Sequence, residues 1–233
     1  MFIYAAGRRD LRNRLDSNIL TQVPGQPSLT VKVARVQYAG AWDPEPYAWT
    51  RFSRWFQGKT NYRLDVQPVL MRDLNAKTYP FAHLTGTAQY NATPDEAAAV
   101  KKYVDDGGVL LIDLTGGTGS FDQSIRSSLL GIAFPSSNLG FIPPTHPLLQ
   151  PGPSGMEDLT HSRLRPYAIE KLGTSGNNLS LFKSGKGHVI FTNLDITSGL
   201  LNTGTWGIIG YEAATAQNLM KNAILWTVDG EKD

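Results

Sequence analysis

Apolar residues along the chain follow two patterns, one typical of β-strands and one typical of α-helices, and the two patterns alternate. Closely spaced valines predict a strand over residues 29–38, which Gly40 ends. Large aromatic residues at helical spacing then predict a helix over residues 47–56, preceded by two prolines of the kind found at helix starts. Shorter apolar runs over residues 66–70 and 79–84 predict two further strands. Strand and helix patterns therefore alternate through the first part of the chain.

The best-marked element begins at Thr93-Pro94-Asp95-Glu96, which carries three helix-start signals. Threonine can cap the first turn, proline suits the first helical position, and the two acids face the positive end of the helix dipole. The helix is expected to end at Gly107 and Gly108, and a buried strand then covers residues 109–113. The acidic Asp113 stands where this strand ends, immediately before a glycine-rich turn.

The second half of the chain predicts a helix, an irregular segment, a hairpin and a closing helix. The first helix covers residues 121–130. Residues 131–176 are rich in proline, glycine and serine, and we expect them to run irregularly over one edge of the fold. Two apolar runs, 179–183 and 188–192, flank a turn sequence and predict an antiparallel hairpin. A final helix is predicted over residues 211–228.

This order of elements predicts the α/β class, with a doubly wound, mostly parallel sheet that ends in a C-terminal antiparallel hairpin. Residues 1–28 are polar and end in a turn-rich connector. We therefore expect an N-terminal arm over residues 1–28 and a single α/β domain over residues 29–233. A chain of 233 residues that is 41% hydrophobic can bury one large core.

Composition excludes several classes of function. With 22 basic and 20 acidic residues, the net charge of +2 gives no basic surface for nucleic acid. The chain has no cysteine, which excludes disulfides, thiolate metal sites and a cysteine nucleophile. No apolar run reaches transmembrane length. The partners that stay open are a small polar ligand or another protein, and nothing in the sequence assigns a cofactor or a metal.

Asp113 is the leading candidate for a catalytic residue. In a parallel sheet, ligands and reactive groups gather at the carboxyl ends of the strands. A side chain in the strand–turn–helix position of Asp113 could be a nucleophile, a general base or a metal ligand. The structural alternative is that the carboxylate accepts backbone amides and stabilises the turn, because aspartate is favoured in turns for that reason alone.

Two further residues could act with Asp113. His146 lies between prolines that fix its loop, so it could serve in acid–base chemistry or bond a nearby carbonyl to hold the loop. Asp195 follows the strand of residues 189–194, and could emerge at the same edge of the sheet as Asp113. Together the three would form a credible hydrolytic or metal site if they converged, which their spacing alone does not show.

Residues at neighbouring strand ends could complete a ligand pocket. Trp42 could stack on a sugar or a base, or else cover the edge of the core. Arg51 could bind an anion, although an ion pair with Asp43 or Glu45 is the simpler interpretation. A glycine pair after Asp113 leaves room for backbone amides to face a ligand. The candidate binding residues are Gly40, Trp42, Arg51, Thr85, Gly86, Gly116 and Gly117.

Several ordered segments together resemble one bacterial family. They are residues 38–40, 49–56, 79–86, 103–113 and 146–148. Over residues 30–228 the chain resembles the family called domain of unknown function 4159. That family is in turn similar to the class I glutamine amidotransferase-like fold, near the trehalose-utilisation-like proteins. The helix–Gly-Gly–strand passage into Asp113 and the late hairpin at Gly185-Lys186-Gly187 carry this wider similarity.

The resemblance implies a three-layer, flavodoxin-like fold, but not the amidotransferase reaction. Asp113 stands where the amidotransferases have their cysteine, and no histidine follows the last strand where their base would stand. The expectation is therefore a non-catalytic ligand-binding or interaction module. The alternative is a hydrolase-like enzyme that uses Asp113, with or without a metal, on a carbohydrate or related polar ligand. Members of the family often look exported, which favours an extracytoplasmic setting in which a leader was removed before residue 1.

Overall fold

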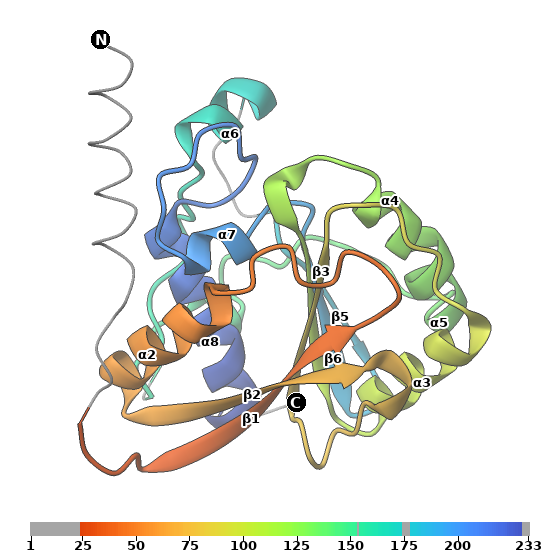
Figure 1. The fold of residues 1–233 in the computed structure, drawn as a ribbon, viewed down its shortest axis with the longest axis horizontal. Helices are drawn as coiled ribbons and strands as arrows, with labels where there is room; N and C mark the ends of the chain where they lie inside the picture. Colours follow the sequence, from red (N-terminus) through yellow and green to blue (C-terminus); the bar gives the residue numbers. More distant parts are fainter. Residues whose placement is uncertain (1–23, 153, 174–177, 230–233) are drawn as a thin grey trace, which may run out of the picture.

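The structure, a computed structural model, describes residues 24–152, 154–173 and 178–229. Its centre is a six-stranded sheet in the order β2-β1-β3-β4-β6-β5 (Figure 1). All neighbouring strands are parallel except β5, which runs antiparallel to β6. The predicted α/β class, with a mostly parallel sheet and a C-terminal antiparallel hairpin, is confirmed. The strands are β1 (Leu29–Gln37), β2 (Tyr62–Leu70), β3 (Phe81–Gly86), β4 (Val109–Leu114), β5 (Ser180–Ser184) and β6 (Gly187–Phe191).

Helices cover both faces of this sheet and give the molecule three layers (Figure 1). One face carries α2 (Ala48–Thr60), α7 (Thr197–Leu200) and α8 (Ala213–Asp229). The other carries α3 (Pro94–Asp105), α4 (Phe121–Ile125) and α5 (Gly131–Ala133). The short helix α6 (Pro166–Leu172) lies beside the loop that follows α7. Single helical turns occupy Met71–Asp73, Thr115–Gly117, Arg126–Leu130 and Pro147–Leu149.

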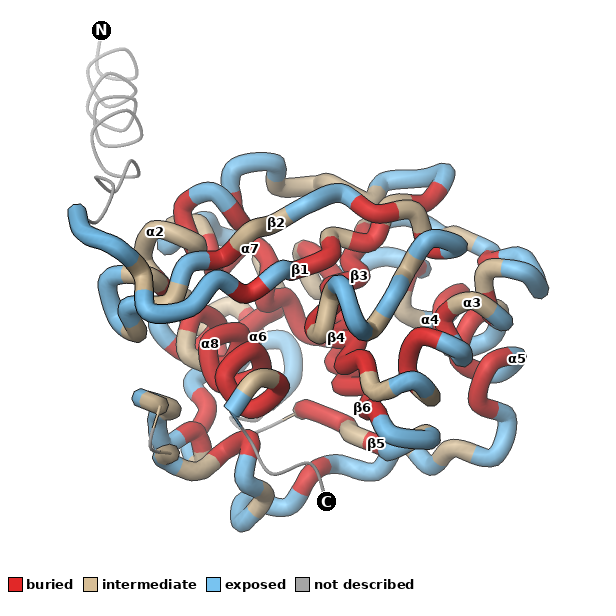
Figure 2. The backbone as a smooth tube through the Cα atoms, turned by 90° about the horizontal axis from the view of Figure 1, so that it is seen from below, coloured by how far each residue is buried: buried red, intermediate tan, exposed pale blue. Residues whose placement is uncertain are grey.

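Successive residues of the central strands enter two separate apolar cores, because side chains alternate between the faces of a sheet. Phe81 and Val109 pack with α2 and α8, whereas Ala82 and Leu110 pack with α3 and α4. β3 and β4 are buried along their whole length, as expected for parallel strands covered on both faces (Figure 2). Polar side chains on these strands therefore lie inside the molecule, and each needs a partner there.

The passage from α3 to β4 follows the sequence prediction. Thr93 and Glu96 form a capping box, in which each side chain accepts a hydrogen bond from the backbone N–H of the other residue. Gly107 ends the helix with a φ of +109°. Gly108 is required for a different reason, since a Cβ there would lie 2.3 Å from the ring of Tyr103. The two glycines thus allow the chain to turn closely over that ring.

Two predicted elements have different limits in the structure. β2 begins at Tyr62, not at residue 66, because it pairs in register with β1 from Leu29 onward. The predicted helix over residues 121–130 changes to a π-helical turn at Arg126. Ser128 contributes to this change, since its hydroxyl donates to the carbonyl of Ser124 at 2.7 Å and accepts from the N–H of Ala92 at 3.0 Å.

The irregular segment of residues 131–176 covers the β5 edge and also supplies core residues. Phe141 forms an antiparallel bridge to Ser180 on β5. Further along, the buried Asn222 of α8 ties the segment down: its Nδ2 donates to the carbonyls of Leu148 and Glu157 at 3.0 and 2.8 Å. The predicted course over an edge is therefore correct, but the segment is also part of the α8 core.

Of the expected N-terminal arm over residues 1–28, residues 1–23 lie outside the described part of the chain. Within the described ranges, no helix combines the length and the apolar character needed to cross a membrane.

Candidate functional site

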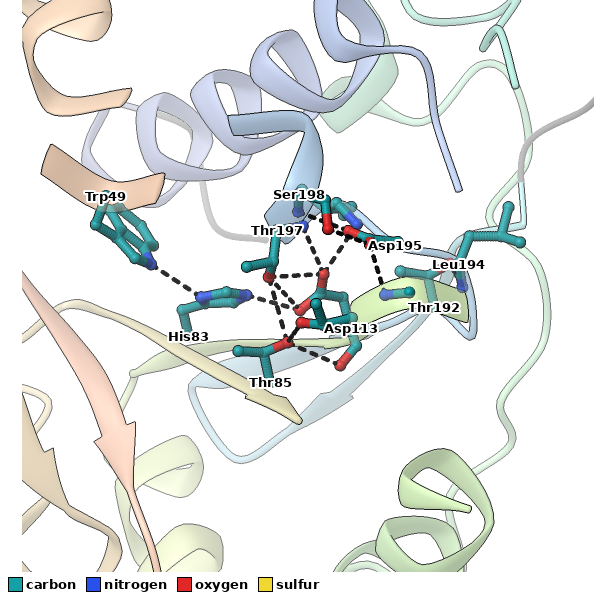
Figure 3. Close-up of polar contacts among 12 residues, drawn as sticks. Trp49, His83, Thr85, Asp113, Thr192, Leu194, Asp195, Thr197 and Ser198 are labelled. Carbon is teal, nitrogen blue, oxygen red and sulfur yellow. Dashed lines mark hydrogen bonds and ion pairs between the residues drawn. The ribbon is translucent and has the colours of Figure 1, made fainter. Parts of the chain in front are cut away.

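Asp113 lies near the end of β4, on the face of the sheet that α2 and α8 cover. Thr85 is its register partner on β3, and His83 lies two residues earlier on the same strand. Since side chains alternate, His83, Thr85 and Asp113 point to the same side. The Asp113 side chain is buried, with the residue only 1% exposed. Figure 3 shows these side chains meeting under the loop that leads into α7.

Both carboxylate oxygens of Asp113 accept hydrogen bonds from the protein (Figure 3). Oδ1 lies 2.9 Å from Nε2 of His83 and 3.0 Å from the hydroxyl of Thr197. Oδ2 accepts from the backbone N–H groups of Ile196 and Thr197 at 2.9 and 2.8 Å, and from the Thr197 hydroxyl at 2.9 Å. The carboxylate therefore fixes the start of α7 to the end of β4.

Trp49 of α2 extends this network to the helix layer. Its Nε1–H donates to Nδ1 of His83 at 3.1 Å. Because Nδ1 accepts, the proton of the neutral imidazole sits on Nε2, which then donates to Asp113. The chain Trp49–His83–Asp113 runs from α2 through β3 to β4, and all three residues are buried.

Asp195 follows β6, and its carboxylate binds the backbone of the turn that follows β4. Its Oδ2 accepts from the backbone N–H of Gly116 at 2.5 Å and from the Ser198 hydroxyl at 2.6 Å. Its Oδ1 accepts from the N–H of Ser198 at 2.7 Å. Asp113, at the end of β4, holds the backbone after β6, while Asp195, after β6, holds the backbone after β4. We call this pair the crossed clamp.

The two carboxyl groups of the crossed clamp have pKa values shifted in opposite directions. Burial and the nearby charge of Asp113 raise the pKa of Asp195 to about 6, against its three hydrogen bonds. Burial also acts to raise the pKa of Asp113. Its interaction with His83 and the backbone bond from Thr197 outweigh burial, so that this pKa lies below its ordinary value.

The glycine turn after β4 is covered by protein. Gly116 adopts a φ of +82°; its N–H is bound by Asp195, and its carbonyl accepts from the N–H of Ile209 at 3.0 Å. Gly117 has a φ of +67°, and a Cβ on it would lie 1.8 Å from the carbonyl oxygen of Ile209. These glycines therefore allow the segment around Ile209 to approach the turn, and the Gly116 amide is not free for a ligand.

Three further candidate binding residues lie next to packed side chains: Thr85 and Gly86 are buried, and Gly40 is exposed. Thr85 is buried and bonds the hydroxyls of Thr115 and Thr197 at 2.7 and 3.2 Å. A Cβ on Gly86 would lie 2.2 Å from the Tyr38 hydroxyl, and one on Gly40 would lie 2.6 Å from the same ring. Both glycines thus provide space for Tyr38.

Trp42 and Arg51 have partners other than those considered from the sequence. The guanidinium of Arg35 lies over the Trp42 ring at 5.2 Å and pairs with Asp43. Asp43 is therefore not the partner of Arg51. Arg51 is buried, and its Nη1 lies 3.4 Å from the carbonyl oxygen of Leu200 at the end of α7. Burial lowers the pKa of its guanidinium.

His146 does not join the two aspartates. Its ring lies 5.7 Å from that of Trp226, which in turn lies 4.8 Å from the ring of His188. His188 pairs with Val109 at the start of β4, whereas Asp113 lies near its end. His146 is therefore at the opposite end of the sheet, and its Nδ1 accepts from the N–H of Leu148 at 3.2 Å. The structure brings together two of the three candidate catalytic residues.

A family model matches residues 32–214, and its description is a domain of unknown function, DUF4159. The chain belongs to the DUF4159 family. This confirms the resemblance to that family, which the sequence indicated over residues 30–228. A search of curated proteins found no match.

Solved structures resemble this DUF4159 chain at low identity. A ThuA-like protein from Bacteroides uniformis ATCC 8492 is 13% identical with a TM-score of 0.43, over 92% of this chain and 97% of that one. The exo-β-1,4-mannosidase Op5Man5 from Opitutaceae bacterium strain TAV5 is 12% identical with a TM-score of 0.43. A β-galactosidase from the Antarctic haloarchaeon Halorubrum lacusprofundi is 13% identical with a TM-score of 0.35.

This chain spans only part of the two glycosidases. The match covers 97% of this chain and 39% of the mannosidase chain, and 90% of this chain and 31% of the galactosidase chain.

The site of the DUF4159 chain includes residues that the sequence analysis did not select. They are His83, Thr197 and Ser198, whose side chains bond the two aspartates. Asp195 directly precedes Ile196, the N-cap of α7, and aspartate near a helix start is a local signal for bonds to the backbone N–H groups there. No local signal joins His83 to Asp113, because that contact depends on the register of two parallel strands. In the described part of the chain, no three His, Cys, Asp or Glu side chains are grouped to hold a metal ion.

Proposed function

We propose that this DUF4159 chain is a non-catalytic ligand-binding or interaction module on an amidotransferase-like fold without the thiol machinery. The observation that carries the proposal is the state of Asp113, which occupies the position expected for the reactive residue. Its carboxylate is buried. Oδ1 accepts a hydrogen bond from His83, and Oδ2 accepts hydrogen bonds from Thr197 at the start of α7. The carboxylate therefore serves to hold β3, β4 and the start of α7 together.

A nucleophile or a general base must come within hydrogen-bond reach of a substrate atom. For Asp113 this would require the start of α7 to move away and leave the N–H groups of Ile196 and Thr197 without partners. The N–H of Gly116 in the glycine turn cannot stabilise developing charge on a substrate, because Asp195 already accepts from it. These contacts favour a structural role for both carboxylates.

One observation favours the alternative, a hydrolase-like enzyme acting on a carbohydrate or related polar ligand. Two neighbouring carboxyl groups whose pKa values are shifted in opposite directions are typical of acid–base pairs. In this reading Asp113 would be the base or nucleophile, with a metal as an optional assistant, and Asp195 the acid. We place it second because Asp195 is fully buried and accepts three hydrogen bonds of its own.

The two functions differ in what Asp113→Asn does to ligand binding. A ligand that binds only the folded state raises the melting temperature. We would screen wild type and Asp113→Asn against sugars, amino acids and divalent metal ions. The proposal predicts that any ligand shift seen in wild type persists in the variant, on a lower baseline melting temperature. A shift that disappears in a variant with unchanged near-UV circular dichroism would place the binding site at Asp113 and contradict the structural role of its carboxylate, on which the proposal depends.

A further inference from the structure

A pocket of about 360 Å³ opens between the start of α6 and the loop that follows α7. This volume is in the range of small-molecule sites, roughly 300–1,000 Å³. The residues that matter for its chemistry are Arg165, Tyr167, Asn202, Thr205, Trp206 and Glu212, and we call it the rim pocket. α6 and the loop after α7 lie side by side in Figure 1.

Two aromatic rings stand at the rim pocket. Trp206 is 80% exposed, although indole is among the most favourable side chains to remove from water. Its ring centroid lies 4.8 Å from that of Tyr167, with an angle of 55° between the planes. The indole is thus supported from one side by another ring while most of its surface faces solvent. A ligand with an apolar face would gain by covering it.

Arg165 lines the same pocket, and the protein holds its guanidinium in place. The residue is 93% buried, and its Nε donates to the carbonyl of Tyr211 at 3.1 Å. Its Nη1 donates to the carbonyls of Thr203 and Thr205 at 3.1 and 3.2 Å. Within the described residues its Nη2 has no hydrogen-bond partner. A buried guanidinium nitrogen without a partner is unusual and indicates a missing acceptor.

The residues that line the rim pocket include one cation and one anion, and the Lys171 ammonium lies 5.3 Å from the Tyr167 ring. Arg165 is attracted by Glu212, which lines the same pocket, and by Asp195 of the crossed clamp. One cation and one anion on the lining give no net attraction for a strongly charged ligand. Glu212 can accept hydrogen bonds, Arg165 can donate them, and Asn202 and Thr205 can do both. The lining therefore suits a neutral molecule that carries many hydroxyl groups and one apolar face.

A pyranose ring has this combination of properties. We propose that the rim pocket binds a neutral saccharide, with a sugar ring against Trp206 and hydroxyl groups bonded to Arg165 and Glu212. This inference rests on the proposed binding function, and it names the class of ligand and the place where it binds. It does not use Asp113, which lies under the start of α7 and does not line the pocket.

Saturation-transfer NMR on the full chain tests this inference, because it detects weak binding. The probes are the methyl glycosides of glucose, mannose, galactose and N-acetylglucosamine, together with cellobiose, mannobiose and lactose. Glucuronate and adenine serve as an anionic and a planar aromatic probe. We expect at least one neutral saccharide to bind wild type, and Trp206→Ala to weaken that binding at least tenfold. Tyr47→Ala, which removes another exposed aromatic residue (76%) that does not line the pocket, is expected to bind like wild type.

Three results would overturn the inference. They are the absence of binding by every neutral saccharide, binding of glucuronate or adenine alone, and equal binding by wild type and Trp206→Ala. Both aromatic side chains are exposed, so neither substitution is expected to impair folding. The same spectra test the proposed function separately. Cleavage of a bound disaccharide over time, lost in Asp113→Asn, would contradict the non-catalytic module while leaving the rim pocket in place.

Discussion

At the scale of single residues, Asp113 and Asp195 each bind the backbone that follows the strand of the other. A buried donor that loses its acceptor costs about 1–3 kcal/mol, so each carboxylate stabilises several groups at once. Their proximity has an electrostatic consequence as well. With both groups ionised, two negative charges lie in the interior, and this repulsion contributes to the raised pKa of Asp195.

The raised pKa of Asp195 predicts that stability depends on pH. Its pKa is about 6 in the folded protein against an ordinary value of 3.8. Between these values the folded state binds more protons than the unfolded state, so the free energy of unfolding falls as pH rises from 4 to 6. The size of this contribution is roughly 3 kcal/mol, at about 1.4 kcal/mol for each pKa unit. Urea denaturation at several pH values would measure it.

Asp195→Asn isolates this contribution from other titrating groups. The amide does not ionise, so the difference in unfolding free energy between wild type and variant should change across pH 4–6, with wild type losing stability relative to the variant. A constant difference across this range would show that Asp195 titrates normally and that the repulsion from Asp113 is weak.

The hydrogen bond from Trp49 predicts the tautomer of His83. Trp49→Phe removes the donor and leaves a buried acceptor at Nδ1, which should lower the free energy of unfolding by about 1–3 kcal/mol. Nitrogen-15 NMR of wild type should show the His83 proton on Nε2, where Asp113 accepts it, and the variant should keep this tautomer but shift the Nδ1 resonance, because Nδ1 loses its hydrogen bond. Trp55→Phe on the same helix controls for the loss of an indole. Equal effects of the two substitutions on the His83 spectrum would contradict the assigned bond.

At the scale of elements, the glycine turn after β4 matters because another segment lies against it. Gly117→Ala is expected to be destabilising by at least about 2 kcal/mol, since its φ is +67° and the new Cβ would meet the carbonyl of Ile209. Gly140→Ala is a matched control, with open space around its Cβ and an expected change within about 0.5 kcal/mol. Denaturant unfolding compares the two. Similar losses in both variants would contradict the close packing of Ile209 on this turn.

How far the sequence predicts each element depends on how local its signals are. The start of α3 is encoded within four residues, and the Ser184–Gly187 turn lies directly between the strands that it joins, so both were predicted. The true start of β2 depends on pairing with β1, which lies more than thirty residues earlier in the chain. Likewise, the link between His83 and Asp113 depends on strand register, and the distance of His146 from both depends on the path of an irregular segment.

At the scale of the whole molecule, the carboxyl edge of the sheet is closed around Asp113, the leading catalytic candidate from the sequence. The loops after β4 and β6 are tied together by the crossed clamp, and α7 covers the result. The rim pocket is open to solvent, with Trp206 exposed beside the fixed Arg165. In this account the crossed clamp stabilises the fold, and the rim pocket binds the ligand.

The measurement that tests this account most directly is the free energy of unfolding of Asp113→Asn in urea. The account predicts a loss of about 2–4 kcal/mol, because an isosteric amide cannot accept every hydrogen bond that the carboxylate accepts. Asp73→Asn, a substitution at an exposed aspartate, should change stability by less than about 0.5 kcal/mol. Equal or greater stability of Asp113→Asn than of wild type would contradict the account, because stabilisation on replacement is the behaviour of a reactive group kept at the expense of stability.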